Sequence, residues 1–456
     1  MKRTTAILIV IILVAVVLRL GVAIYLGNIV DAPPLLTDQR SYHALGERLI
    51  SGYGFSFDRG WYPFTPANTP TAHWSFLYSL FVAVIYSLCG VNPLAVRIIQ
   101  AILGGILLPL TIYLFSRRLL ESGPFQRRGV NAVEVGLVAA GISAVYFYFI
   151  LYAATLMTET FYIVALLWSL YLAIGLAQHP TLKNGLLLGV SLGIATLLRQ
   201  SILPWIVVSV VWLAWVAVRA GYFRRMIGAL ALVGLLIGLL IAPFTLRNYR
   251  VYGEFLLLNS NAGYAMYSAQ HPMHGTNFQE FVGAPMPDDV SGMNEAQMDR
   301  ELMRRGIGFV LADPGRYVQL SLSRVPDFFE FWPTPDTTLI NNVGRVGSFG
   351  LMLPFMIFGL VLAVIWGGPM ASGGWLAFTT TPLALMLLFI VLYTMQHVLT
   401  WAMPRYRLPA DAVALSFAAL GISHLVHWFR HKVKNHRRQP VAREWAEEYN
   451  QANNQS

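Results

Sequence analysis

The chain has 456 residues, of which 56% are hydrophobic and only 12% are charged. Soluble domains carry about 25% charged residues, so this composition excludes an ordinary soluble domain. The net charge is +10, but in a chain of recurring apolar runs the location of the charges matters more than their sum, and we expect no nucleic-acid partner. The single cysteine, Cys89, excludes an internal disulfide.

The first apolar segment follows a basic head, in MKRTTAILIVIILVAVVLRLGVAIYL. This resembles a signal peptide, but the apolar core is too long and no small-x-small cleavage site follows. We therefore expect a retained membrane anchor. Arg19 lies inside this segment, where we expect it either to pair with an acid such as Glu159 or to reach the outer interface.

Apolar runs of about 18 to 25 residues are long enough to cross a bilayer as helices, and they predict an all-α polytopic membrane protein. We expect ten spans with both termini inside. Their predicted positions are 5–26, 93–116, 132–150, 158–177, 182–198, 201–219, 226–246, 346–367, 374–394 and 408–427.

The apolar segment 73–90 decides the orientation of every later span. If it crossed the membrane, the arginines of the loops near 117–128 and 219–225 would lie outside. If it lies on the outer surface as a juxtamembrane helix, those arginines and the basic tail all face the cytoplasm. The second arrangement obeys the positive-inside rule at every loop, and we adopt it.

Two large regions, 27–92 and 247–343, then face outward, together with the short loop MQHVLTWAMPRYRLP. The cytoplasmic loops are short, and no phosphate-binding loop motif or GxGxxG after a strand is present. Any chemistry is therefore expected on the outer face. The predicted parts are a transmembrane module with its first outer loop (1–250), a second outer loop with surface helices (251–345), C-terminal spans (346–428) and a basic cytoplasmic tail (429–456).

Asp38 lies about a dozen residues beyond the first span, within LTDQRSYHALGERLISGYGFSFDRGW. One interpretation is a solvated acid or the N-terminal cap of a helix over 39–51. The other is chemistry at the membrane surface, because an acidic residue close to a membrane span in an otherwise apolar chain is a candidate for function.

Five arginines lie at the outer boundary, from which basic residues are normally excluded. Anionic headgroups or snorkelling would explain them. A phosphate clamp would explain them too, because guanidinium groups bind phosphate oxygens bidentately. The five are Arg199, Arg247, Arg250, Arg405 and Arg407.

Other outer residues are candidates for substrate contacts. Glu159 either favours the N-terminus of a helix electrostatically or contacts substrate. His271 and His274 have an HxxH spacing that could share a divalent metal, although no HExxH or tight His/Cys cluster is present. Interfacial belts explain most of the outer aromatic residues, but some could stack on a sugar ring. The remaining candidates for substrate binding are Tyr42, His73 and Tyr264.

Read in order, five stretches and the terminal RYRLP make the chain resemble a family 39-type glycosyltransferase of the GT-C fold. That superfamily includes the dolichyl-phosphate-mannose protein mannosyltransferases and the bacterial transferases that place aminoarabinose on lipid A. The stretches are LTDQRSYHALGERLISGYG, NTPTAHWSFLYSLFVAVIYSLCGVNPLAVRIIQ, the TE of LMTETF, GVSLGIATLLRQSILP and PFTLRNYRVYGEFLLLNSNAGYAMYSAQHP.

The resemblance implies a polyprenyl-phosphate-linked sugar donor used on the periplasmic or extracellular face of the inner or plasma membrane. It matches Asp38 to the catalytic aspartate of the family's first loop, and Arg199, Arg247 and Arg405 to basic residues near the lipid phosphate. Asn68 departs from the lipid A transferases, which carry an acid just before the proline that Pro70 resembles, so metal assistance of their kind is in doubt.

The sequence specifies neither the sugar nor whether the acceptor is a glycan, a lipid or a protein. Two other functions remain open from the sequence. A lipid-linked-sugar flippase or transporter would need charge near the membrane midplane and a path open to both sides. An O-antigen-type polymerase would also use outer arginines.

Overall fold

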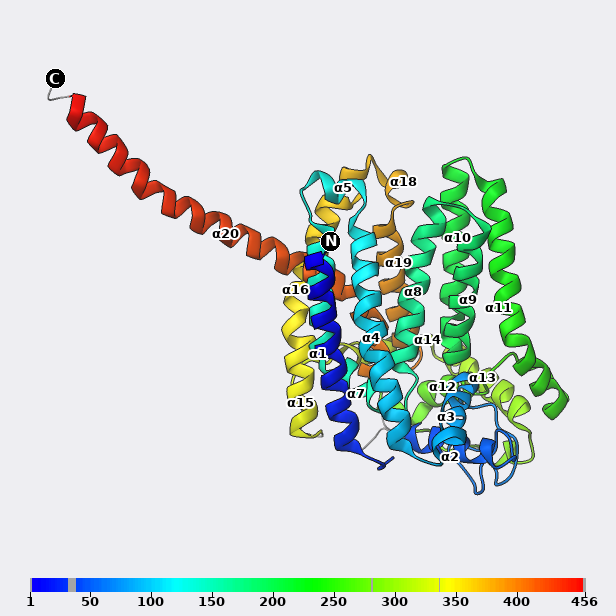
Figure 1. Ribbon diagram of the computed structural model, residues 1–456. Helices are drawn as coiled ribbons and strands as arrows, with labels where there is room; N and C mark the ends of the chain where they lie inside the picture. The colour runs from blue at the N-terminus through cyan, green and yellow to red at the C-terminus, as the bar shows by residue number, and fades with distance from the viewer. Residues whose placement is uncertain (1, 32–37, 280–281, 336, 454–456) are drawn as a thin grey trace.

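The computed structural model describes residues 2–31, 38–279, 282–335 and 337–453, with side chains described up to residue 432. Residues 32–37 of the first outer region and most side chains of the predicted basic tail lie outside the described residues. The described part consists of helices joined by loops (Figure 1). Two isolated β-bridges, Ser56–Pro70 and Trp61–Thr65, lie in the first outer region. The predicted all-α membrane fold is confirmed.

Within the described ranges, eight helical segments are long and apolar enough to cross a membrane. Five are single helices: α1 (Lys2–Leu26), α4 (Pro93–Leu120), α8 (Glu159–Gln178), α11 (Phe223–Tyr252) and α19 (Pro382–Leu399). The other three join neighbouring elements. Gln200–Arg219 contains α10 (Leu203–Arg219); Leu339–Ser372 contains α15 (Leu339–Arg345), α16 (Leu351–Gly367) and α17 (Pro369–Ser372); and Pro404–Lys432 contains the start of α20 (Leu408–Asn453).

Two further predicted spans correspond to helices that do not meet this length criterion singly. The segment 132–150 forms α6 (Ala132–Val145) and α7 (Phe147–Ala153), which are bent by 60° relative to each other. The segment 182–198 forms α9 (Leu182–Leu198), an apolar helix of 17 residues. Each of the ten predicted spans therefore contains helix.

The predicted span 374–394 is displaced in the structure. The helix α19 begins only at Pro382, and α18 (Trp375–Phe378) forms a separate turn before it. Thr381 accounts for the later start, because its side chain caps α19 by accepting a hydrogen bond from the Ala384 amide. Pro382 then occupies the first turn, where a missing amide proton costs nothing.

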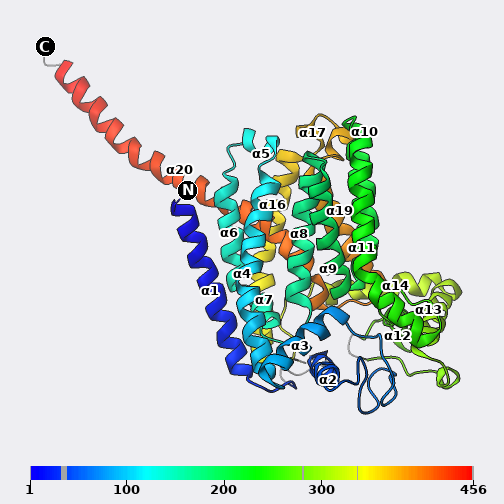
Figure 2. The ribbon, with the colours of Figure 1, turned by 45° about the vertical axis from the view of Figure 1, so that its right-hand side comes forward.

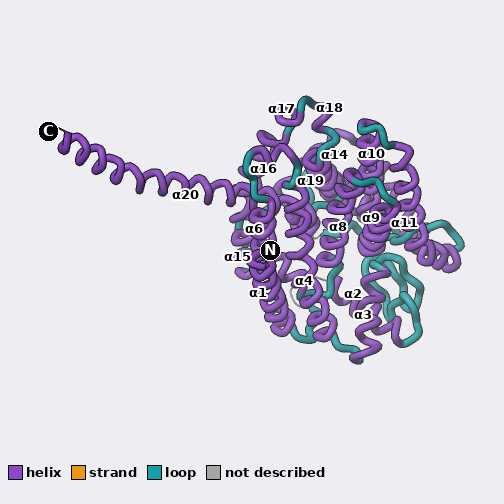
Figure 3. Tube along the Cα trace, turned by 45° about the horizontal axis from the view of Figure 1, so that its top comes forward, coloured by secondary structure: helices purple, strands orange, loops and turns teal. Residues whose placement is uncertain are grey.

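The outer regions gather at one end of the helix bundle. Figures 1 and 2 place α2 (Asp38–Ile50), α3 (Phe76–Cys89), α12 (Ala262–Gln270) and α13 (Glu295–Ala312) there, and α5 (Gly123–Arg127) at the opposite end. The loops around α2 and α3 are prominent in Figure 3. With 14 residues, α3 spans about 21 Å, less than the roughly 30 Å of a bilayer core. This agrees with the prediction that 73–90 lies at the surface.

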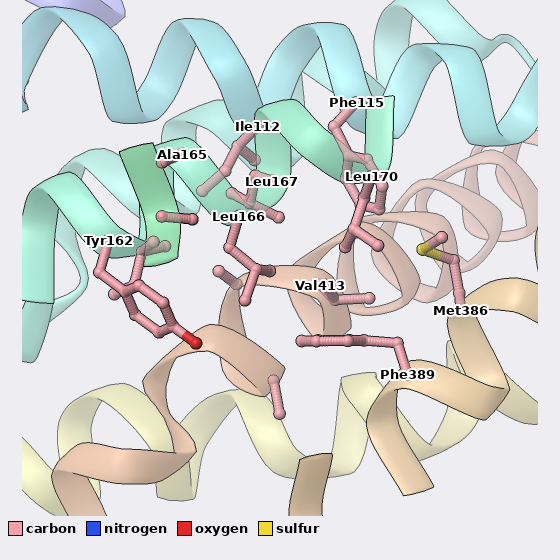
Figure 4. Packing of buried hydrophobic residues seen from close by; sticks show 14 of the residues in the cluster. Ile112, Phe115, Tyr162, Ala165, Leu166, Leu167, Leu170, Met386, Phe389 and Val413 are labelled. Carbon is pink, nitrogen blue, oxygen red and sulfur yellow. The ribbon is translucent and has the colours of Figure 1, made fainter. Parts of the chain in front are cut away.

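The centre of the bundle is an apolar core around α8. Figure 4 shows side chains of α8 packed among residues of α4, α19 and α20. Leu166 and Leu170 of α8 are buried, as are Ile112 of α4 and Val413 of α20. Burial of this kind holds the outer ends of α8 and α20 at fixed positions. The candidate Glu159 begins α8, and the candidates Arg405 and Arg407 lie in the turn just before α20.

The second outer region, in which surface helices were expected, contains two helices that follow each other closely along the chain. Asn294 starts α13 with a capping box, in which its side chain accepts from the Gln297 amide and the Gln297 side chain accepts in return. Asp313 caps α14 (Pro314–Phe328) by accepting from the Arg316 amide. These helices are therefore specified locally by their first residues.

The helices α12 and α13 approach closely at two glycines. A Cβ atom at Gly263 would lie 1.8 Å from the Asp299 carbonyl oxygen, and one at Gly306 would lie 2.7 Å from the Met266 backbone. Asp299 Oδ1 also accepts a hydrogen bond from the Gly263 amide at 2.6 Å. The carboxyl group of Asp299 is thus confined between the two helices.

We expect Asp299 to make the stability of the protein depend on pH. Burial raises the pKa of Asp299 to about 6. Because the unfolded chain releases this proton near pH 4, the contribution of Asp299 to the free energy of unfolding should fall by on the order of 2–3 kcal/mol as the pH rises from about 4 to about 6. Across this range in detergent, the stability of the natural protein relative to Asp299→Asn, measured by thermal unfolding, should therefore fall as the pH rises. Equal slopes for both would contradict this account.

Candidate functional site

Asp38 is the first residue of α2, and its carboxylate forms an ion pair with Arg405. The Arg405 Nη1 atom donates to Asp38 Oδ2 at 2.8 Å. The two side chains are only 20% and 16% exposed, so water competes little for the pair. Arg405 lies in a 3-10 turn, Pro404–Arg407, before the last span. The ion pair therefore joins the first outer region to the C-terminal part of the bundle.

Arg199 follows the end of α9 and forms a second ion pair, with Glu159 at the start of α8. Arg199 Nη2 lies 2.5 Å from Glu159 Oε1, and Arg199 Nε donates to Thr158 Oγ1 at 2.9 Å. Burial alone would lower the pKa of Arg199, but Glu159 together with Tyr406 and Tyr393 outweighs burial and holds this pKa above its ordinary value. Arg199 is thus a charged group at the outer end of the bundle.

The two ion pairs meet at the ring of Tyr406. The Arg199 and Arg405 guanidinium carbons lie 5.5 Å and 5.1 Å from its centroid. Arg405 Nη2 also donates to the Tyr406 hydroxyl at 3.3 Å. We refer to Asp38, Glu159, Arg199 and Arg405 as the acid–arginine cluster. Each guanidinium in it is held by a carboxylate that an incoming anion could replace.

Tyr42 and His73 lie beside this cluster. Burial and the negative charge of Asp38 both raise the pKa of Tyr42, so its hydroxyl stays protonated. Burial lowers the pKa of His73, and the charges of Glu295 and Asp38 oppose this only in part. The His73 imidazole is therefore neutral at neutral pH. Its Nδ1 atom is buried and has no hydrogen-bond partner among the described residues.

Tyr264 lies across the boundary between the two outer regions. The Tyr62 hydroxyl donates to the Tyr264 hydroxyl at 3.2 Å, and the two rings meet edge to face. Burial raises the pKa of Tyr62, and the nearby charge of Asp38 contributes in the same direction. The tyrosine pair therefore joins the two outer regions, and Tyr62 lies close enough to Asp38 to be affected by its charge.

Gln39 and Arg97 fix the start of α2. Gln39 Oε1 accepts from Arg97 Nη2 at 3.0 Å and from the Leu156 amide at 3.1 Å. Arg97 Nη2 also donates to the Ile29 carbonyl at 2.8 Å. Arg97 was not among the sequence candidates. An arginine within the predicted span 93–116 is nevertheless unusual, because charged residues inside membrane spans are rare and usually have a specific partner or role. It positions the residue next to Asp38.

Arg247 and Arg250 are placed differently from the other predicted clamp residues. Arg247 donates to Asn248 Oδ1 at 3.0 Å, and its guanidinium lies 5.6 Å and 5.9 Å from the ring centroids of Phe76 and Tyr252. Arg250 is exposed at the outer end of the same helix, α11. Neither residue has a contact with the acid–arginine cluster among those that the structure gives for the described chain.

Arg407 is held in a buried structural network. Its Nε atom donates to Asp411 Oδ1 at 2.9 Å, and Nη1 donates to the Phe328 carbonyl at 2.5 Å. The guanidinium lies 3.3 Å from the Phe349 ring centroid. Because Arg407 is 1% exposed and its charge is matched by Asp411, this geometry contradicts the expected phosphate contact and favours a structural role.

Arg19 is also placed differently from expectation. It donates to the Ala144 and Ser143 carbonyls, each at 3.2 Å, and not to Glu159, whose partner is Arg199. Those carbonyls lie at the end of α6, just before the bend into α7. Because a bend leaves helix carbonyls without their usual amide donors, Arg19 supplies donors there. The expected pairing of Arg19 with Glu159 is therefore wrong.

The two candidate metal ligands are occupied by backbone groups. His271 Nδ1 accepts from the Met273 amide at 3.2 Å, and His274 Nε2 lies 3.0 Å from the Ser268 carbonyl oxygen. Within the part of the chain that the structure describes, no group of three His, Cys, Asp or Glu side chains could hold a metal ion. These residues do not fit a metal site, and we derive no step through a metal.

Asn68 has a structural explanation. Its backbone φ angle is +56°, in the left-handed region that asparagine tolerates better than most residues. Its Oδ1 atom accepts a hydrogen bond from Arg48 Nη2 at 2.9 Å. Asn68 therefore stabilises a turn of the first outer region.

Comparison with known proteins finds similarity in sequence pattern and in fold. Residues 73–246 match the sequence pattern of the family described as dolichyl-phosphate-mannose-protein mannosyltransferase. The oligosaccharyltransferase AglB from Archaeoglobus fulgidus, solved with an inhibitory peptide and a dolichol-phosphate, is similar with a TM-score of 0.56 and 14% identity. The match covers 95% of this chain and 52% of that chain, so the chain spans about half the length of the archaeal enzyme.

ArnT from Cupriavidus metallidurans, solved with undecaprenyl phosphate, matches with a TM-score of 0.40 and 13% identity, over 91% of this chain and 76% of that chain. No curated protein sequence matches the chain. At this identity the archaeal structure shows the fold alone, and the family pattern covers residues 73–246, less than half of the chain. The chain therefore shares the fold of the archaeal oligosaccharyltransferase and is similar, over residues 73–246, to dolichyl-phosphate-mannose-protein mannosyltransferases.

Proposed function

We propose that the protein is a membrane glycosyltransferase that moves a sugar from a polyprenyl-phosphate-linked donor to an acceptor hydroxyl on the periplasmic or extracellular face. The observation that carries this proposal is the acid–arginine cluster, in which Asp38 lies against Arg405 and beside Arg199. The family pattern in residues 73–246 and the dolichol-phosphate in the archaeal structure support a lipid-phosphate donor.

The donor enters from the bilayer with its phosphate at the outer interface. Its negative charge competes with Asp38 for Arg405 and with Glu159 for Arg199. Both guanidiniums can bind phosphate oxygens, and both stabilise the negative charge that develops on the leaving lipid phosphate. Arg247 and Arg250, on α11, then contribute at most to the wider electrostatic field.

Asp38 is the base of the proposed reaction. Its carboxylate takes the proton of the acceptor hydroxyl while that oxygen forms a bond to the anomeric carbon of the sugar. The bond from the anomeric carbon to the phosphate oxygen breaks, and its electron pair leaves with the polyprenyl phosphate. Because a phosphate leaving group is a weak base and needs no proton, one carboxylate suffices and the single displacement inverts the anomeric configuration.

Asp38 has two roles in this scheme, one before and one after the donor binds. Before binding, it neutralises Arg405 at 2.8 Å. Once the phosphate engages Arg405, the Asp38 carboxylate is released toward the acceptor. The His73 imidazole, neutral because burial lowers its pKa, can accept or donate a hydrogen bond to the acceptor without adding charge.

The experiment that tests this function uses protein purified in detergent and reconstituted in vesicles, supplied with a polyprenyl-phosphate sugar and an acceptor-containing membrane extract. Release of polyprenyl phosphate supports a transferase. Movement of the intact lipid across vesicle membranes without release would favour a flippase and contradict the proposal.

A further inference from the structure

Glu295, the first residue of α13, is a buried carboxylate shared by the two outer regions. It is 5% exposed, and four neutral donors contact its oxygens. Oε1 accepts from Thr65 Oγ1 at 2.7 Å, and Oε2 accepts from the Ala72 amide at 2.8 Å. Ser260 Oγ at 2.9 Å and the Tyr252 hydroxyl at 3.3 Å also donate to Oε2. A buried carboxylate requires such donors, and two of these come from each outer region.

Asn259 and Asn261, on either side of Ser260, hold the chain segment that carries His73, which Glu295 contacts at the Ala72 amide. Asn259 Nδ2 donates to the Ala72 carbonyl at 3.0 Å and to the Trp74 carbonyl at 2.7 Å. Asn261 Nδ2 donates to the His73 carbonyl at 3.3 Å. The backbone on both sides of His73 is therefore fixed by the second outer region.

Aromatic contacts extend the interface between the two outer regions toward Asp38. The Phe64 ring lies 5.5 Å from the His73 ring and 6.0 Å from the Tyr264 ring, measured between centroids. Tyr62 and Tyr264 join hydroxyl to hydroxyl. A Cβ atom at Gly283 would lie 2.6 Å from the Tyr264 hydroxyl, so that glycine leaves room for the tyrosine pair. His73 and the tyrosine pair thus form one wall, built by both outer regions.

We propose that Glu295 is a positioning residue for the acceptor. It clamps the first outer region against the second, so that His73 and the tyrosine pair stand at a fixed place beside Asp38 and define where the acceptor hydroxyl lies. This inference rests on the proposed function, and it concerns the acceptor rather than the donor, whose contacts are the arginines.

Two substitutions separate this role from others. Glu295→Ala removes every acceptor and should lower kcat about 100-fold, because displacement of reacting groups by about 1 Å costs that much. Glu295→Gln keeps one oxygen for the Ala72 amide, and the Thr65 hydroxyl can turn to accept from the new amide, so kcat should fall by about 10-fold or less. The affinity for polyprenyl phosphate should stay unchanged in both variants.

The matched control is Glu254→Gln. Glu254 also bonds α13, through Gln297 Nε2 at 2.8 Å and through Arg300, but at the surface and away from His73. It should keep the natural kcat. Hydrogen exchange of the amides at residues 71–74 should speed up in Glu295→Ala and stay unchanged in Glu254→Gln, and this readout needs no turnover.

Two outcomes of the Glu295 experiments would contradict the proposed role of this residue. A Glu295→Gln variant as inactive as Glu295→Ala would mean that the negative charge itself is required. A folded Glu295→Ala variant with natural kcat, or with unchanged exchange at 71–74, would mean that the clamp does not exist. If the natural protein releases no polyprenyl phosphate while the exchange result holds, the proposed function fails and the clamp stands.

Discussion

Asp38→Asn should lower the rate of sugar transfer by about 10²- to 10⁴-fold, the range that a positioned general base supplies. The amide of asparagine cannot take the acceptor proton. The substitution also frees Arg405 from its carboxylate partner, which lies 2.8 Å away in the natural protein. We therefore expect the affinity for polyprenyl phosphate to be unchanged or higher, and a merely structural aspartate would not produce that combination.

The measurement for Asp38 pairs a turnover assay with a direct binding assay for polyprenyl phosphate. Asp58→Asn is the matched control, because Asp58 belongs to the same outer region and its contact with Arg59, at 3.9 Å, is exposed. That control should keep natural turnover. Residual turnover of Asp38→Asn above about a tenth of the natural rate would refute the base assignment, given the magnitudes typical of general bases.

Arg405→Lys and Arg199→Lys should each lower transfer by about 10²- to 10³-fold, as expected when one preorganised donor to a developing oxyanion is lost. Lysine keeps the positive charge but cannot bind two phosphate oxygens with a planar fork. In contrast to Asp38→Asn, both variants should also bind polyprenyl phosphate more weakly. Turnover and lipid-phosphate affinity measured on the same preparations will show this contrast.

Arg250→Lys is the control for this pair, because Arg250 is exposed on α11. It should leave turnover nearly unchanged. If Arg250→Lys impaired transfer as strongly as Arg405→Lys, the phosphate would bind along α11, and the assignment of Arg199 and Arg405 as the phosphate ligands would be wrong.

The sequence predicted which residues to consider but not which of them meet. Arg405 and Arg407 are two residues apart in PRYRLP, and the same reasoning selected both. In a 3-10 turn, with about three residues per turn, such side chains point in different directions. Arg405 therefore meets Asp38, whereas Arg407 meets Asp411. A pattern of residue types does not contain that distinction.

The fold was largely predictable because hydrophobic length and charge asymmetry are local properties of the sequence. The surface placement of α3 came from the arginines of other loops, and its length of 14 residues agrees. Glu295 and Arg97 were not among the residues selected from the sequence, for opposite reasons. Glu295 lies in a polar stretch where an acid is unremarkable, and only the folded structure shows that it is buried. Arg97 stood out within an apolar span and could have been found.

The most direct test of the central claim is release of polyprenyl phosphate from a polyprenyl-phosphate sugar by the purified protein, with an acceptor-containing membrane extract and with Asp38→Asn in parallel. We expect release that depends on the acceptor, a transferred sugar of inverted anomeric configuration, and almost no release by Asp38→Asn. Equal release by both proteins, or a product of retained configuration, would contradict that claim.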